Sequence, residues 1–299
     1  MKRTVALLLM AMSLIFLGAC GDDDGDGPTA AGGEQGAGGQ MATGGEMAVG
    51  GERDAGGEIN AGGVEAAGGA PTGGETGEGG AMAPPNIEAL DNGSYVCRPA
   101  GEGPFPGVLY NHGGRGTAVG GDLEGTCRAF AERGYIARSQ KRPEENSLMG
   151  QLDSALEGLD ALRTEPTVDV DRIGVIGFSR GGLLTLQTLI TRADQLHAAV
   201  ICAPAPANGA LERTLMNVDA VSAPVHVMVS ENDQQSMGDD VVDHVALSTS
   251  VYDALDSAGK VVEFSIYPPF ETDGHRLFFE VRNPWWSDAV SFFDRHLQP

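Results

Sequence analysis

Short apolar runs alternate with amphipathic segments along the chain from about residue 87 to its end. The apolar runs have the length and composition of buried β-strands, and they fall at 94–97, 106–111, 135–137, 173–178, 198–202, 224–230 and 261–267. Between them, apolar residues recur at helical spacing over 120–133, 148–164, 180–192, 240–258 and 284–296. The alternation predicts an α/β domain with a mostly parallel, doubly wound sheet and helices on both faces.

The N-terminus has a different pattern. The apolar segment 5–17 follows a basic start and leads into Leu17-Gly18-Ala19-Cys20, and it is too short to span a bilayer comfortably. This arrangement resembles a bacterial lipoprotein signal peptide, which implies removal of residues 1–19 and lipid on Cys20. An ordinary secretory signal is the alternative. Gly21, rather than an aspartate, follows Cys20, and in lipoproteins of this kind that favours the outer membrane over the inner one. We therefore expect an exported protein that is lipid-anchored at the outer membrane or cell surface of a Gram-negative bacterium.

Residues 20–86 form a glycine-rich stretch between this leader and the first strand. Gly-Gly recurs about every six residues from 32 to 80, and the residues between carry too little apolar surface to offset the ordering of so many glycines. We therefore expect a disordered tether with a reach of about 45 Å. A collagen-like or β-repeat stalk is the alternative, although the period of six lacks the glycine at every third position that collagen needs. The catalytic domain is predicted at 87–299.

The chain is acidic, with a net charge of −23. Between 21 and 86, twelve acidic residues stand against the single basic Arg53. No basic patch interrupts the folded part, which argues against nucleic acid as a partner.

The strand 173–178 ends in Gly177-Phe178-Ser179-Arg180-Gly181, directly before the helix 180–192. Glycines on both sides of the serine remove side chains that would collide in a sharp turn, so the hydroxyl can stand exposed. This is the pattern of a nucleophile elbow. The alternative is a serine that caps the helix N-terminus.

A serine nucleophile needs a base, and six histidines are available. His275 follows the last strand in a glycine-flanked loop, and we predict that it is the general base. Four others fall within or at the start of predicted strands or helices: His197, His226, His244 and His296.

The base needs a carboxylate partner on its far ring nitrogen. Asp233 lies just past the strand 224–230, in the chain order serine, acid, histidine, and is the favoured acid. The rivals are Glu231, Asp239 and Asp240. Asp273 is expected to be a surface turn residue.

Backbone N–H groups usually stabilise the oxyanion of acyl transfer. We expect one from Arg180 and another from Gly113 or Gly114, after the strand 106–111. His112 could instead orient that loop, and the glycine pair alone could simply be a tight turn.

Taken together, these residues resemble the α/β-hydrolase superfamily, with little or no cap domain. The likeness covers Pro106 to the end and is carried by Asn111-His112-Gly113-Gly114, the elbow, Glu231-Asn232-Asp233 and Asp273-Gly274-His275. It is closest to the dienelactone-hydrolase-like and prolyl-oligopeptidase-like branches, although dienelactone hydrolases proper use cysteine where Ser179 stands. The resemblance implies a serine carboxylesterase acting on a small-molecule ester. A peptidase or amidase acting on a short peptide, or a non-catalytic binding module, is the alternative.

The remaining cysteines are Cys97, Cys127 and Cys202. Cys97 and Cys127 are a candidate disulfide in an exported protein, and Cys202 is expected to be buried. No cysteine or histidine pair has metal-ligand spacing, so neither a metal nor another cofactor is expected. The loops 138–147 and 203–222 are expected to shape the pocket, the second with a short helix. Trp285 and Trp286 could line the pocket but are better explained by packing.

Overall fold

The computed structural model describes residues 83–114, 118–143, 148–237 and 240–298. The predicted leader, Cys20 and nearly all of the tether lie outside these ranges, as does Asp239. Glu75–Pro299 forms one unit by its internal contacts, and the fold below is that of its described residues. None of their helices is both long and apolar enough to cross a membrane.

The predicted mostly parallel sheet is confirmed. In the described part of the chain it has eight strands in the order β1-β2-β4-β3-β5-β6-β7-β10. Neighbours are antiparallel from β1 to β4 and parallel from there on. The bounds are β1 Asn86–Ala89, β2 Tyr95–Arg98, β3 Phe105–Asn111, β4 Ile136–Gln140, β5 Val168–Phe178, β6 Ala198–Cys202, β7 Val225–Ser230 and β10 Val262–Tyr267.

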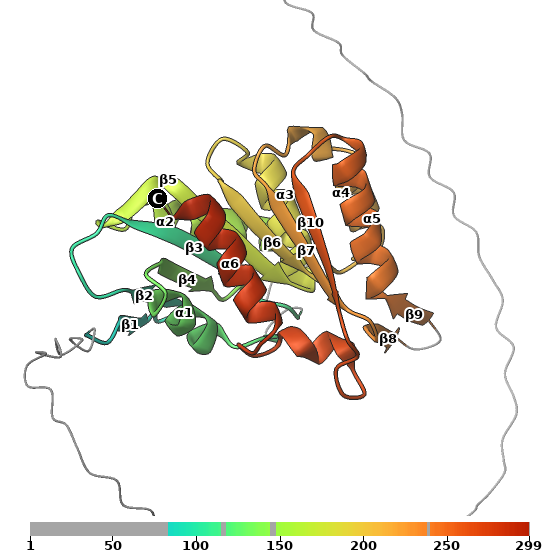
Figure 1. Ribbon diagram of the computed structural model, residues 1–299, viewed down its shortest axis with the longest axis horizontal. Helices are drawn as coiled ribbons and strands as arrows, with labels where there is room; N and C mark the ends of the chain where they lie inside the picture. The colour runs from blue at the N-terminus through green and yellow to red at the C-terminus, as the bar shows by residue number, and fades with distance from the viewer. Residues whose placement is uncertain (1–82, 115–117, 144–147, 238–239, 299) are drawn as a thin grey trace, which may run out of the picture. The chain divides into compact units, whose positions relative to one another are not determined.

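Helices cover both faces of the sheet, as predicted. Figure 1 shows α6 crossing one face, with α1 on the same side. Successive strand residues point to opposite faces. On β3, Val108 packs in the core cluster that holds the buried side chains of α1 and α6, and Leu109 packs in the cluster of α3 and α5. The bounds are α1 Leu123–Ala131, α2 Leu148–Arg163, α3 Arg180–Thr191, α5 His244–Ser257 and α6 Trp285–Leu297.

The prediction of a helix beginning at residue 240 is wrong. A two-stranded hairpin of β8 (Gln234–Met237) and β9 (Asp240–Asp243) comes first, and α5 begins at His244. The Asp243 carboxylate accepts a hydrogen bond from the N–H of Ala246 at 2.9 Å, which caps the helix there. The two β-branched valines before this cap suit a strand. β1 was also missed, because its four residues are mostly exposed and carry little apolar signal.

The connection 203–222 contains α4 (Ala210–Leu215) and η1 (Val218–Ala220), which confirms the short helix predicted there. The candidate disulfide is also confirmed: Cys97 on β2 is bonded to Cys127 on α1. Cys202 is a buried free thiol, as expected.

Parallel register places the candidate residues at one edge of the sheet. Near its carboxyl end, β3 pairs Asn111 with Gly177 of β5. β7 and β10 end together, with Ser230 opposite Tyr267. The segments that leave these strands therefore begin at the same edge, which is where such sheets bind ligands.

Candidate active site

Ser179 lies on the turn between β5 and α3 with φ 55° and ψ −116°, a conformation that a non-glycine residue rarely adopts. The neighbouring glycines make this turn sterically possible. A Cβ on Gly177 would collide with the backbone of Gly181, and one on Gly181 would collide with the Asn111 carbonyl. Although Ser179 occupies the N-cap position of α3, its side chain makes no capping hydrogen bond. Ser179 thus has a strained backbone conformation, and its side chain does not cap the helix. This combination is typical of a functional residue.

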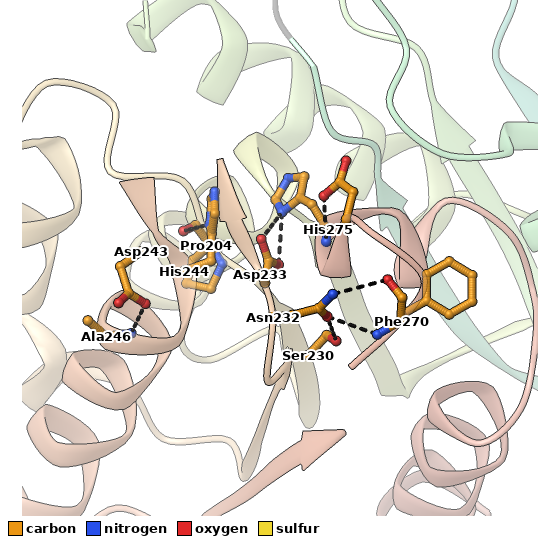
Figure 2. A network of polar contacts seen from close by, with 10 residues as sticks. Pro204, Ser230, Asn232, Asp233, Asp243, His244, Ala246, Phe270 and His275 are labelled. Carbon is orange, nitrogen blue, oxygen red and sulfur yellow. Dashed lines mark hydrogen bonds and ion pairs between the residues drawn. The ribbon is translucent and has the colours of Figure 1, made fainter. Parts of the chain in front are cut away.

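Asp233 and His275 meet, as the sequence predicts. His275 is the second residue of η2 (Gly274–Phe278), the short helix that follows β10. Its Nδ1 is 2.9 Å from each carboxylate oxygen of Asp233 (Figure 2). Asp233 is wholly buried and His275 nearly so. Burial disfavours charge on both groups, so it raises the pKa of Asp233 and lowers the pKa of His275.

The His275 ring also lies next to the elbow. It packs on Phe178, the residue immediately before Ser179, with the ring centroids 4.6 Å apart. The carboxylate on Nδ1 leaves Nε2 as the nitrogen able to act as a base. The pair therefore has the arrangement of the acid and base of a serine hydrolase, and the His275 ring contacts the residue that precedes Ser179.

Asn232 fastens the loop that carries Asp233 to the loop that carries His275. Its Oδ1 accepts the N–H of Phe270 at 2.8 Å, and its Nδ2 donates to the Phe270 carbonyl at 3.3 Å (Figure 2). Gly274 packs so closely here that a Cβ would meet the Asn232 amide oxygen and the Asp233 backbone. Sequence reasoning missed this role, because only the folded chain brings the two loops together.

The rival acids fall elsewhere. Glu231 is exposed, Asp240 begins β9 on the hairpin, and Asp239 lies outside the described residues. Asp273 was expected to be a surface turn residue. It caps η2 instead, because its Oδ1 accepts the backbone N–H of His275 at 3.1 Å.

The structure distinguishes the two glycines predicted for the oxyanion hole. The N–H of Gly113 donates to the carbonyl of Gly120 at 2.7 Å, so it is already used. Gly114 lines the same cavity as Ser179 and Arg180. Arg180 begins α3, and the N–H groups at a helix start point out along the axis, where anions bind. Gly114 and Arg180 are therefore the donors that best match the predicted oxyanion hole.

A buried arginine holds the loop of Gly113 and Gly114 in place. The guanidinium of Arg142 donates to the carbonyls of His112, Gly113 and Gly114. Burial first, and then the positive charge of Arg180, lower the pKa of Arg142 to about 10, so it stays cationic at neutral pH. The sequence assigned the loop 138–147 to the pocket without singling out this residue, since arginines in a polar loop are ordinarily solvated.

His112 contacts the same loop, in line with the expectation that it could orient this loop. Its Nε2 accepts the backbone N–H of Arg142 at 3.2 Å, so Nδ1 carries the proton and donates to the Gly113 carbonyl. Burial, followed by the charge of Arg142, lowers the pKa of His112 to about 3. His112 is therefore neutral, and its fixed tautomer fits a structural role.

A cavity of about 430 Å³ opens beside Ser179. Its walls come from the turn after β3, the elbow, the segment after β6, the β8–β9 hairpin and the start of α5. The lining residues are Gly114, Ser179, Arg180, Ala205, Pro206, Ala207, Asn208, Gln235, Val242 and His244. The predicted contribution of the loop 203–222 is thus confirmed, whereas none of the described residues of the loop 138–147 lines this cavity. Trp285 and Trp286 are buried in the aromatic core with Phe130 and Phe278 and pack rather than line the pocket.

His244 is the clearest residue that sequence reasoning overlooked. It was set aside as a helical histidine, yet it is the first residue of α5 and is buried against His275, with ring centroids 4.2 Å apart. Its backbone N–H donates to the Asp233 carbonyl at 3.0 Å, which closes the base of the hairpin. No motif spacing in the sequence reveals this contact. The position of His244 depends on the β8–β9 hairpin, which lies between Asp233 and His244 and was not predicted.

The sheet order, the elbow serine and the acid–histidine pair at the carboxyl edge define an α/β-hydrolase fold. Within that class, the family model "Dienelactone hydrolase family" matches residues 93–296. The chain belongs to the dienelactone hydrolase family, which confirms the predicted relationship.

One curated relative shares part of this sequence. A protein described as an uncharacterized peptidase of Bacillus subtilis is 32% identical in an alignment 122 residues long, which covers 37% of this chain and 47% of the relative. The match therefore spans about half of that relative's length.

Among solved structures, an acylaminoacyl peptidase of Pyrococcus horikoshii has a TM-score of 0.54 at 19% identity, over 73% of this chain and 42% of the other. A protein provisionally described as a dienelactone hydrolase of Klebsiella pneumoniae has a TM-score of 0.51 at 18% identity, over 68% and 92%. At these identities the likeness shows the fold alone.

Proposed function

We propose that this protein is a serine hydrolase that cleaves a carboxylic ester through an acyl-enzyme on Ser179. The observation that carries the proposal is the pairing of His275 with buried Asp233 beside the strained elbow of Ser179. The cavity at Ser179 offers space for a small ester.

In the proposed reaction, His275 Nε2 takes the proton of the Ser179 hydroxyl as Oγ attacks the ester carbonyl carbon. The carbonyl oxygen becomes an oxyanion, held by the N–H groups of Gly114 and Arg180. Collapse breaks the bond to the alcohol oxygen, which receives the proton from Nε2 and leaves. Water then attacks the acyl-enzyme by the same proton path, releasing the acid and restoring the Ser179 hydroxyl. The Asp233 carboxylate stabilises the imidazolium in both halves.

A fluorophosphonate probe tests the nucleophile. We expect one covalent adduct on Ser179, located by peptide mass spectrometry, and none in Ser179→Ala. Ser222→Ala is the matched control, because its hydroxyl is exposed and donates only to a backbone carbonyl. Unlabelled wild type would instead support a non-catalytic binding module on the same fold.

The second candidate is a peptidase or amidase. It is favoured by the Bacillus subtilis relative described as a peptidase. Matched nitrophenyl esters and nitroanilides of the same acyl groups separate the two. We expect the ester to be cleaved far faster, relative to its uncatalysed rate, and equal acceleration of both would favour the amidase.

We further propose that the protein is exported and anchored through lipid on Cys20, and that it hydrolyses its substrate at the outer membrane or cell surface. The disulfide supports export, because such bonds persist in oxidising compartments. Radiolabelled palmitate should enter wild type and not Cys20→Ser, and fractionation should move that variant out of the membrane. Equal labelling of both would contradict the anchor.

A further inference from the structure

Three metal-ligating side chains from separate parts of the chain meet beside the proposed nucleophile. Asp233, His244 and His275 each offer one ligand atom, and these atoms lie within 4.8 Å of one another. All three are buried, and Figure 2 shows them together. They come from the turn between β7 and β8, the start of α5 and η2. Spacing along the chain gave no sign of such a cluster.

The orientation of His244 suits metal ligation. Its Nδ1 is 3.2 Å from the carbonyl oxygen of Pro204. A carbonyl only accepts, so Nδ1 carries the proton and the lone pair stands on Nε2. Metal-ligating histidines ordinarily donate their other ring N–H to a carbonyl or carboxylate in this way. His244 also lines the cavity, which provides a route for an ion from solvent.

We propose that Asp233, His244 and His275 bind a divalent transition-metal ion, with Zn²⁺ the best chemical match. Two imidazoles and one carboxylate are a ligand set for zinc, whereas Mg²⁺ and Ca²⁺ prefer oxygen. Tetrahedral zinc with ligands at about 2.0–2.1 Å places its ligand atoms about 3.3 Å apart. Atoms already within 4.8 Å reach this by side-chain adjustment. The fourth position is left for water from the cavity.

Occupation of this site takes His275 out of use as a base. Nδ1 can donate its lone pair to the metal only after giving up the proton that now faces Asp233, and the neutral imidazole then carries its single proton on Nε2. The nitrogen that would accept the Ser179 proton is therefore already protonated, and the bound dication disfavours further positive charge on the ring. Loss of activity on zinc binding rests on the proposed serine-hydrolase function, while the binding itself does not.

Isothermal calorimetry of the full chain, purified without a histidine tag, tests the site with ZnCl₂. We expect one Zn²⁺ per chain at this site and no comparable heat with MgCl₂. Loss of an outer-shell partner already costs about 10–100-fold in metal affinity. His244→Ala and the size-matched His244→Gln should therefore weaken binding by at least about 100-fold. His296→Ala is the control, because it removes an exposed imidazole outside the cluster.

Wild-type protein provides two readings that need no variant. Co²⁺ should give the visible absorption of a four-coordinate site, and Zn²⁺ should displace it. Zn²⁺ should also slow fluorophosphonate labelling of Ser179, and a chelator should restore it. Wild type that binds no zinc, or variants that bind as tightly as wild type, would overturn the site. Failure of the hydrolase function would appear separately, as absent labelling without zinc.

Discussion

The guanidinium of Arg142 donates a hydrogen bond to the carbonyl of Gly114 at 3.0 Å, and this places a buried cation behind the proposed oxyanion hole. A carbonyl fixed in this way fixes the peptide units around it. The oxyanion donor therefore depends on a residue that follows a different strand.

Arg142→Met should lower kcat while leaving KM nearly unchanged, because the oxyanion loop is used in the transition state. Loss of one oxyanion donor costs about 10²–10³ in kcat, and we expect misplacement of Gly114 to cost about 10–100-fold. Steady-state kinetics on a nitrophenyl ester measure kcat and KM of the variant and of wild type. Arg128→Met, an exposed arginine paired with Glu124, should behave as wild type. A pure rise in KM would contradict the role.

Asp233→Asn should lower kcat by about 10³–10⁴-fold, because an amide neither fixes the His275 tautomer nor stabilises its imidazolium. Glu231→Gln is the matched control. That carboxylate is exposed and was a rival for the same role, so its loss should change kcat less than about twofold. If Glu231→Gln were the more damaging change, the assignment of the acid would be wrong.

The pH profile of kcat/KM should follow the protonation of His275. Burial lowers its pKa below the ordinary value of about 6.5. The imidazole therefore stays neutral, and active as a base, until the pH falls through this lowered value. We expect full activity at neutral pH and a half-maximum below about pH 6.5. Circular dichroism at each pH checks that the fold persists, and a midpoint above 6.5 would contradict the prediction.

The β8–β9 hairpin should control the size of the accepted acyl group. Val242 lines the cavity, whereas the adjacent Val241 is 64% exposed. Val242→Trp should lower kcat/KM for long-chain esters about 10–100-fold more than for acetyl esters, since pocket contacts of one or two methylenes are worth that much. Val241→Trp should leave the chain-length preference unchanged. A parallel loss for all esters would indicate distortion of the site instead.

Removal of the Cys97–Cys127 bond should lower the free energy of unfolding by about 3–4 kcal/mol, by the loop-closure entropy of its 30-residue separation. Urea denaturation of wild type and of the double serine variant measures it. Under reducing conditions the two should unfold at nearly the same urea concentration, which isolates the disulfide from the substitution. Equal midpoints without reductant would contradict the expectation.

The sequence by itself determined the alternation of strands and helices, the elbow at Ser179 and the order of Ser179, Asp233 and His275. These are local features: a period of apolar residues, glycines around one turn, and polar residues directly after strands. The mostly parallel sheet follows from them, since crossover connections allow few other arrangements.

Only the tertiary structure decided which residues surround Ser179, Asp233 and His275. It leaves Gly114 rather than Gly113 as the proposed oxyanion donor, because the N–H of Gly113 is bonded to the Gly120 carbonyl, and it brings Arg142 behind the loop. A hairpin stands where a helix was predicted to begin, and after it His244 packs against His275. Local patterns do not contain these relationships, because each depends on contacts between segments far apart in the chain and on which hydrogen-bonding groups burial leaves available.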